Sequence, residues 1–153
     1  MRNLSVRAPW AALASVVLAG ALATPALGAA FQGAQEEGSF PLDLTLAKAE
    51  IPLDIGASAI SFRPVSVTVA DNPKKSRKTL RLKLGFRNSS DRDYFVYATA
   101  TLLDADGRSL VIKSKKVKAD DDDNASVSFK FKLTYAEAER VKKCGFKYAL
   151  EKD

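Results

Sequence analysis

The sequence predicts a mainly β protein: an antiparallel immunoglobulin-like β-sandwich of about seven to eight strands, with one short helix before the last strand. Apolar residues recur at every second position over much of the chain after residue 40. Turn-forming residues interrupt this alternation at intervals of roughly 8–12 residues, which is typical of a sandwich or barrel. No long helical segment separates the strands. Since successive strand side chains point to opposite sides, each sheet should have one buried and one solvent-facing side.

An N-terminal signal peptide is predicted over residues 1–28. A basic start is followed by an apolar run over residues 10–23, and small residues then continue to Ala30. This order is typical of a secretory signal, and cleavage is expected after Gly28 or Ala30. The chain is therefore expected to be periplasmic or secreted, without stable membrane insertion after cleavage. A retained N-terminal anchor is the alternative interpretation.

The segment that follows, residues 29–39, is rich in Gln, Glu, Gly and Ala. We interpret it as a disordered leader to a β-sandwich domain over residues 40–153. Alternating residues predict the first strands of this domain over 40–47, 51–55 and 60–69. Prolines interrupt these strands, which favours sheet edges or kinks. An Asp-Asn-Pro turn at residues 71–73 ends this part.

The clearest hairpin of the chain has strands over residues 80–86 and 94–102. Its first strand alternates leucine or phenylalanine with basic residues and a glycine. The intervening segment, residues 88–93, consists of Asn, Ser, Asp and Arg, and the first three favour tight turns. The apolar positions predicted to face the core of the first strand are Leu80, Leu82, Leu84 and Phe86.

Two further turns and strands complete the predicted sheets. Gly107 closes an Asp-Ala-Asp-Gly hairpin turn, because glycine readily takes the positive φ that tight hairpins need. Alternation continues over residues 110–117 and, after an acidic turn at 120–124, over residues 127–133. Thr134 and Glu137 then form a capping-box pattern, which predicts one short helix before a closing strand over residues 146–150.

Charge and cysteine content set limits on partners and stabilising bonds. The chain has 24 basic and 18 acidic residues, a net charge of +6, and no histidine. The charge is mild, so nucleic acid is not an expected partner. Cys144 is the only cysteine, which rules out an internal disulfide. A buried thiol is predicted there, with an intermolecular bridge or a reactive thiol as alternatives.

Two segments of the hairpin region resemble a known family of domains. Residues 82–94 combine a strand with an Asn-Ser turn, and residues 100–107 combine a strand end with an aliphatic-Asp-x-x-Gly hairpin turn. They resemble FxLYD-type and related immunoglobulin-like bacterial extracytoplasmic domains over about residues 65–133, although only Leu102 and Asp104 match the namesake positions. The resemblance implies a β-sandwich on the outer side of a membrane, and it brings no catalytic residues.

The residue types give little support to catalysis or to metal binding, and no cofactor is predicted. Without histidine, neither a Ser-His nor a Cys-His pair can form, and no spacing singles out a Ser-Lys pair. Zinc lacks its usual ligands. Calcium could use the acidic turn at residues 120–123, although a solvated turn is the favoured interpretation.

Basic residues occupy the polar positions of several predicted strands. If these strands share a sheet, its solvent-facing side would attract anionic glycans, lipid headgroups or an acidic partner. Protection of sheet edges and solubility are the simpler explanation. Phe95 and Tyr97 also stand at polar positions and suggest a partner surface. The basic positions are Arg81, Lys83, Lys113, Lys115, Lys130, Lys132 and Lys147.

The sequence thus leads to two hypotheses of function. The first is an exported, non-enzymatic binding or structural module that engages an envelope or secreted protein, or another envelope component, through a sheet face or edge. The alternative is an accessory domain that binds an anionic surface glycan or lipid through a basic sheet face.

Overall fold

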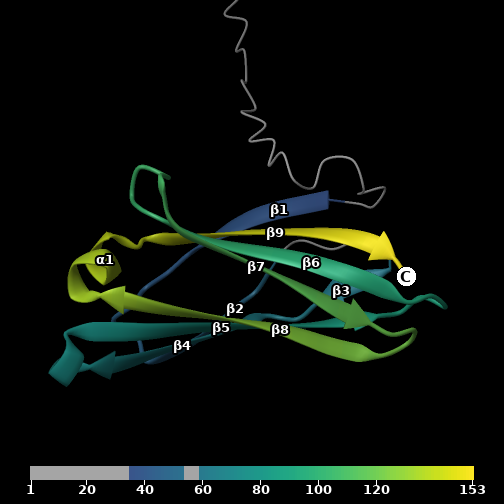
Figure 1. The fold of residues 1–153 in the computed structure, drawn as a ribbon, viewed down its shortest axis with the longest axis horizontal. Coiled ribbons are helices and arrows are strands. Elements are labelled where there is room, and N and C mark those ends of the chain that lie inside the picture. The colour runs from purple at the N-terminus through teal and green to yellow at the C-terminus, as the bar shows by residue number, and fades with distance from the viewer. Residues whose placement is uncertain (1–34, 54–58) are drawn as a thin grey trace, which may run out of the picture.

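Two antiparallel sheets pack face to face in the computed structural model, which describes residues 35–53 and 59–153 (Figure 1). The first sheet, here called the β6 sheet, has the order β1-β9-β6-β7. Its strands are β1 (Gln35–Pro41), β9 (Lys143–Lys152), β6 (Tyr94–Leu103) and β7 (Ser109–Ala119). The predicted signal peptide lies outside the described residues. Within those residues, no helix has the length and apolar character needed to cross a bilayer.

The second sheet, here called the β5 sheet, is built around its longest strand. Its strands are β2 (Lys48–Ile51), β3 (Ile60–Phe62), β4 (Val65–Asn72), β5 (Arg77–Asn88) and β8 (Asn124–Thr134). β5 pairs with β4 near its start, with β3 near its end and with β8 along almost its whole length. β4 and β3 therefore share one edge of β5, and β8 takes the other. A 3-10 turn, η1 (Pro73–Lys75), connects β4 to β5.

The predicted fold class is confirmed, because the structure is mainly β with antiparallel sheets and one short helix before the last strand. The described residues contain nine strands rather than seven to eight. The predicted disordered leader is wrong over residues 35–39, which belong to β1 and pair with β9. The predicted strand over 40–47 is also wrong after Pro41, because residues 42–47 form an irregular turn.

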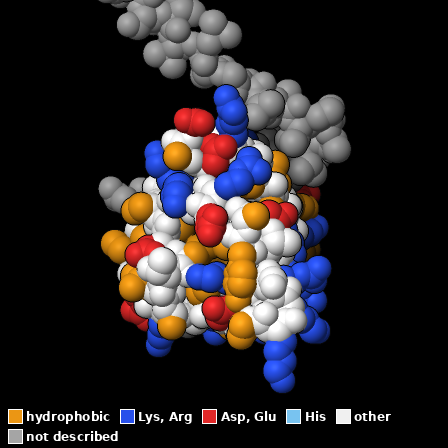
Figure 2. All heavy atoms as spheres, turned by 90° about the vertical axis from the view of Figure 1, so that its left-hand side faces the viewer, with side chains coloured by type: hydrophobic (Ala, Val, Ile, Leu, Met, Phe, Trp, Pro, Cys, Tyr) orange, Lys and Arg blue, Asp and Glu red, His pale blue; other side chains and the backbone are white. Residues whose placement is uncertain are grey.

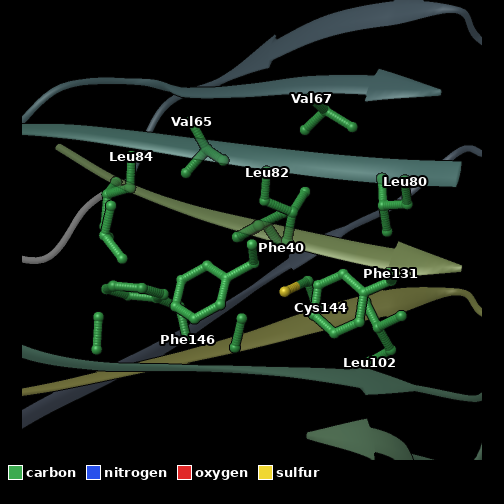
Figure 3. Close-up of a cluster of buried hydrophobic side chains, with 14 of the residues drawn as sticks. Phe40, Val65, Val67, Leu80, Leu82, Leu84, Leu102, Phe131, Cys144 and Phe146 are labelled. Carbon is green, nitrogen blue, oxygen red and sulfur yellow. The ribbon is translucent and has the colours of Figure 1, made fainter. Parts of the chain in front are cut away.

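The core lies between the two sheets and matches the alternation of the sequence (Figure 3). Leu80, Leu82, Leu84 and Phe86 of β5 are at most 3% exposed. The facing strand β6 buries small residues at two of its inward positions. Its Ala98 and Ala100 pair with Tyr148 and Phe146 of β9, respectively. Small side chains beside large ones leave room for an aromatic cluster, which consists of Phe62, Phe86, Phe146 and Tyr148.

The helix α1 (Tyr135–Arg140) begins as the capping box predicts. The side chain of Thr134 accepts a hydrogen bond from the backbone N–H of Glu137, and the carboxylate of Glu137 accepts one from the backbone N–H of Thr134. The hydrogen bond that the carboxylate accepts from the backbone N–H of Thr134, and a second one that it accepts from the Thr134 hydroxyl, lower the pKa of Glu137. Ala138 and Val141 are buried, so the helix closes one end of the sandwich.

The Cys144 thiol is completely buried, as predicted. Burial disfavours the thiolate and raises the pKa of Cys144 to about 12. We expect this thiol to resist a water-soluble thiol reagent at pH 8 in the folded protein and to react fully in denaturant. Because only the unfolded thiol ionises near its ordinary pKa of about 8.5, the free energy of unfolding should fall as the pH rises above that value. Rapid labelling of the native protein would contradict the buried position.

Candidate functional site

The seven basic positions singled out in the sequence do not form one face. Four of them lie together on the outer side of the β5 sheet. These four are Arg81 and Lys83 of β5 and Lys130 and Lys132 of β8. Their neighbours along each strand point into the core, so alternation places all four charges on the solvent side.

The other three basic positions lie elsewhere because their strands belong to the β6 sheet. Lys113 and Lys115 of β7 stand opposite the inward-facing Ala100 and Ala98, at the open side of the sandwich. The Nζ atom of Lys113 lies 2.5 Å from the carbonyl oxygen of Lys130 and 5.4 Å from the ring centre of Phe131. Lys113 therefore covers the gap between the two sheets.

Lys147 lies on the outer side of the β6 sheet, on strand β9. It stands opposite Thr99 of β6 and Glu37 of β1. The two sheets turn their outer sides away from each other, so Lys147 is on the far side of the molecule from Arg81. One ligand bound to the outer side of the β5 sheet would not reach it.

The strand register sets two cations side by side in the β5 sheet. Arg81 is directly opposite Lys130 of β8, and Thr68 stands opposite Arg81 on the other edge. Like charges directly opposite each other destabilise a sheet. Among the described residues, no carboxylate lies within 4.0 Å of the four basic side chains on this face, since none of them takes part in an ion pair. Their charges are left to solvent or to a ligand.

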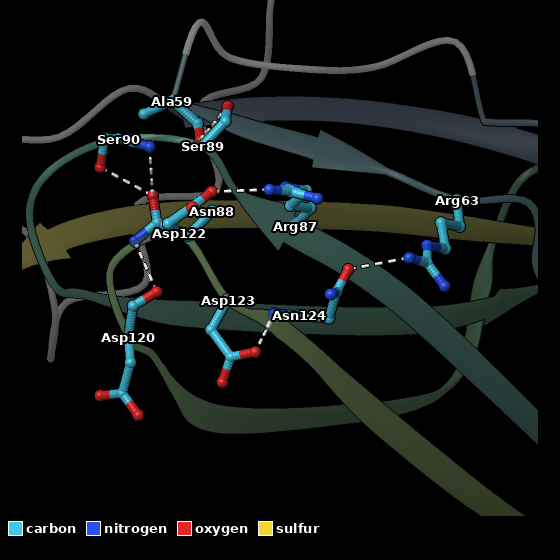
Figure 4. Close-up of polar contacts among 10 residues, drawn as sticks. All are labelled: Ala59, Arg63, Arg87, Asn88, Ser89, Ser90, Asp120, Asp122, Asp123 and Asn124. Carbon is cyan, nitrogen blue, oxygen red and sulfur yellow. Dashed lines mark hydrogen bonds and ion pairs between the residues drawn. The ribbon is translucent and has the colours of Figure 1, made fainter.

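Arg63 joins this face in a way that the sequence analysis missed. It follows β3, and its side chain lies across Gly85 of β5, with Cδ 3.4 Å from where a Cβ of residue 85 would stand. Its guanidinium donates a hydrogen bond of 2.8 Å to the side-chain oxygen of Asn124 (Figure 4). A glycine inside a strand often marks such a close approach, and this was the available signal.

We call the resulting surface the basic stripe. Arg77, exposed at the start of β5, is four residues from Arg81 and so points to the same side of the sheet. The members of the stripe are Arg63, Arg77, Arg81, Lys83, Lys130 and Lys132. Figure 2 looks at the α1 end of the sandwich, and Lys and Arg side chains project from its lower margin, where Figure 1 has the β5 sheet and the η1 turn with Lys74 and Lys75. Arg87 continues the line of β5 but forms an ion pair of 2.6 Å with Asp122. Arg87 is therefore neutralised, and we leave it out of the stripe.

Hydroxyl groups rather than apolar side chains flank the charges. The outward residues of β4 next to the stripe are Ser66 and Thr68, and those of β8 are Ser126 and Ser128. Glu50 of β2, two strands away from β5, stands opposite Ser66. The face thus offers cations and hydrogen-bonding groups. The carboxylates at its margins include Glu50 and, near Arg77, Glu137, whose pKa is lowered by its hydrogen bonds from Thr134 and also by the charge of Arg77.

The aromatic pair on the outer side of the β6 sheet is covered. The Nζ atom of Lys116 lies 3.7 Å from the ring centre of Phe95 and 5.0 Å from that of Tyr97. The hydroxyl of Tyr97 also donates a hydrogen bond to Glu151. A stacking ligand would have to displace Lys116, so this pair is a weaker candidate than the basic stripe.

The acidic turn after β7 directs its carboxylates to separate protein partners. Asp120 pairs with Lys118 at 3.0 Å, Asp122 pairs with Arg87, and Asp123 accepts a hydrogen bond from the backbone N–H of Asn124. Within residues 35–53 and 59–153, no three acidic or cysteine side chains converge to hold a metal ion. This geometry gives no support to the calcium alternative.

Comparisons with known proteins give no family for the chain. No protein-family model matches it, and no curated protein matches its sequence. Among solved structures, it is similar to a DUF1425 family member from Shewanella sp. pv-4, with 14% identity, 72% of this chain and 94% of that chain covered, and a TM-score of 0.42. It is also similar to the enzymatically active domain of tailspike protein 4 of bacteriophage CBA120, with 9% identity, coverage of 78% and 17%, and a TM-score of 0.27.

Proposed function

We propose that this chain is an exported, non-enzymatic binding module that attaches to an anionic component of the cell envelope through the basic stripe. The observation that carries the proposal is the pair of cations Arg81 and Lys130. They lie directly opposite each other, and within residues 35–53 and 59–153 neither takes part in an ion pair with a carboxylate. An anionic ligand between them would relieve their repulsion.

Solubility alone accounts poorly for this arrangement. Elsewhere the chain compensates clustered charges: Lys118 lies 2.8, 3.0 and 3.2 Å from carboxylate oxygens of Asp93, Asp120 and Asp153. Protection against aggregation would place lysines on edge strands. That explanation fits Lys130 and Lys132, because β8 pairs only with β5 within the part of the chain that the structure describes. It does not fit Arg81 and Lys83, because β5 has paired strands on both sides.

Export and the absence of catalysis belong to the same proposal. Residues 1–28 have the composition of a secretory signal, and the hairpin region resembles FxLYD-type domains, which lie outside the membrane. A β-sandwich with a polar outer face suits that role. The sequence contains no histidine, so the commonest general base of enzymes is missing.

Matched charge reversals test the proposed function. The double variant Arg81→Glu/Lys83→Glu changes the stripe, and Lys115→Glu/Lys147→Glu makes the same change in net charge away from it. The measurement is co-sedimentation of the protein with envelopes from the cells that express it. We expect the first variant to reduce this binding by about tenfold or more, because several exposed charge contacts are lost. The second should stay within about twofold of the wild type.

Salt provides a second readout of the same experiment. Contacts between exposed charges are screened as the ionic strength rises, so wild-type binding should weaken with added salt. Equal losses in the two double variants would show that net charge alone matters and would overturn the role of the stripe. Thermal unfolding of both variants checks that the exposed changes leave the fold intact.

A further inference from the structure

We infer that the ligand of the basic stripe is a linear anionic glycan that lies lengthwise along β5. This inference rests on the proposed function and specifies the class of ligand. Its starting point is the shape of the stripe. Among the described residues, the continuous line of cations lies on β5, the adjacent β8 and Arg63, while the outward positions of β4 carry no charge. Lys48 of β2 is on the same face but beyond β4, opposite Thr68, and is therefore separate from this line.

The stripe is several times longer than it is wide. Outward side chains of one strand repeat at roughly 7 Å, and adjacent strands lie about 5 Å apart. Arg77 and Gly85 are eight residues apart on β5, so the stripe extends for about 27 Å at roughly 3.4 Å per residue. A polymer with acidic groups at regular intervals can meet successive cations along this line, whereas a small anion can meet only one or two.

Arg63 gives the line a fixed end. Asn124 holds one nitrogen of its guanidinium, while the side chain remains exposed and keeps other N–H groups for a ligand. A guanidinium in a set orientation suits two parallel hydrogen bonds to a carboxylate or sulfate group. Gly85 lies under this side chain, and a Cβ at residue 85 would already be in van der Waals contact with the Cδ atom of Arg63 at 3.4 Å.

The side chains beside the cations favour a glycan over other anionic partners. Proteins that lie on a bilayer commonly insert aromatic or aliphatic side chains, and single-stranded nucleic acids stack on aromatic rings. Neither kind of large apolar side chain points outward from β4, β5 or β8. Their outward neutral residues include Ser66, Thr68, Thr79, Ser126 and Ser128, which can bond sugar hydroxyl groups.

Calorimetric titration with heparin oligosaccharides, a linear sulfated and carboxylated probe, tests the inference. We expect the decasaccharide to bind the wild-type protein about tenfold or more tightly than the tetrasaccharide, because it reaches more cations at once. Arg63→Ala should weaken decasaccharide binding about fivefold. Arg108→Ala, an exposed arginine in the β6–β7 turn, is the matched control and should stay within about twofold.

Three outcomes would overturn the inference. Equal affinity for the two oligosaccharides would exclude a lengthwise ligand, and equal effects of Arg63→Ala and Arg108→Ala would exclude the fixed end. The third outcome is that the wild-type protein binds phosphatidylglycerol vesicles or a DNA duplex but not the decasaccharide, and that Arg81→Glu/Lys83→Glu abolishes this binding. The stripe would then remain the binding surface, but its ligand would not be a glycan. The proposed function itself fails if the stripe variant binds envelopes as well as the wild type, or if the two double variants lose envelope binding equally.

Discussion

Replacing Leu82 by aspartate is expected to unfold the protein, whereas the same replacement of its neighbour Lys83 is expected to leave it folded. Leu82 is 3% exposed and lies between Val67 of β4 and Phe129 of β8. Loss of a buried leucine alone costs roughly 2–5 kcal/mol. A carboxylate without a partner in this apolar setting adds several kcal/mol more. The sum approaches the entire stability of an ordinary domain, about 5–15 kcal/mol.

Lys83→Asp makes a good control because it introduces the same side chain one residue away. Lys83 is exposed on the outer side of the β5 sheet, where a carboxylate stays hydrated, so we expect a change within about 1 kcal/mol. Circular dichroism of both variants shows whether they are folded, and urea unfolding gives their free energies of unfolding. A similar loss of stability in the two variants would show that the assigned faces of β5 are wrong.

Local alternation explains why the faces of β5 and β8 could be predicted, and non-local pairing explains what was missed. The alternation correctly places Arg81, Lys83, Lys130 and Lys132 on the solvent-facing side of their own strands. Nothing in a single strand reveals which sheet it joins. Alternation alone therefore groups Lys147 with the other basic positions, although β9 pairs with β6 and carries Lys147 on the other sheet.

The first strand and Arg63 show two further limits of sequence reasoning. Residues 35–39 lack apolar alternation, and their strand forms because β9 offers its free edge to their backbone. Backbone hydrogen bonds leave no mark in composition, so composition alone predicts a disordered leader for a polar segment of this kind. Arg63 follows a short strand and reaches the stripe only across Gly85, a contact set by the pairing of β3 with β5.

Asn88 begins a segment that the sequence predicts as a simple turn, but two of its contacts are with residues 31 and 32 positions away. Its side chain is completely buried at the end of β5. The Nδ2 atom donates to the carbonyl oxygens of Arg92, Ala119 and Asp120 at 2.7, 3.1 and 3.1 Å. The Oδ1 atom accepts from the backbone N–H and the hydroxyl of Ser90. One side chain thus ties the β5–β6 turn to the turn between β7 and β8 (Figure 4).

Asn88→Ala is therefore expected to lower the free energy of unfolding by about 3 kcal/mol, because buried carbonyl groups lose their donor and each such loss costs roughly 1–3 kcal/mol. Ser90→Ala removes only a hydroxyl at the edge of this network and should lower the free energy of unfolding by about 1 kcal/mol.

Asn88→Asp separates the effect of hydrogen bonding from that of side-chain volume. It keeps the size of the side chain but turns a carboxylate oxygen toward the same carbonyls, so it should destabilise the protein at least as much as alanine does at neutral pH. Urea unfolding gives all three values. An aspartate variant close to the wild type would mean that the donated hydrogen bonds do not hold the two turns together.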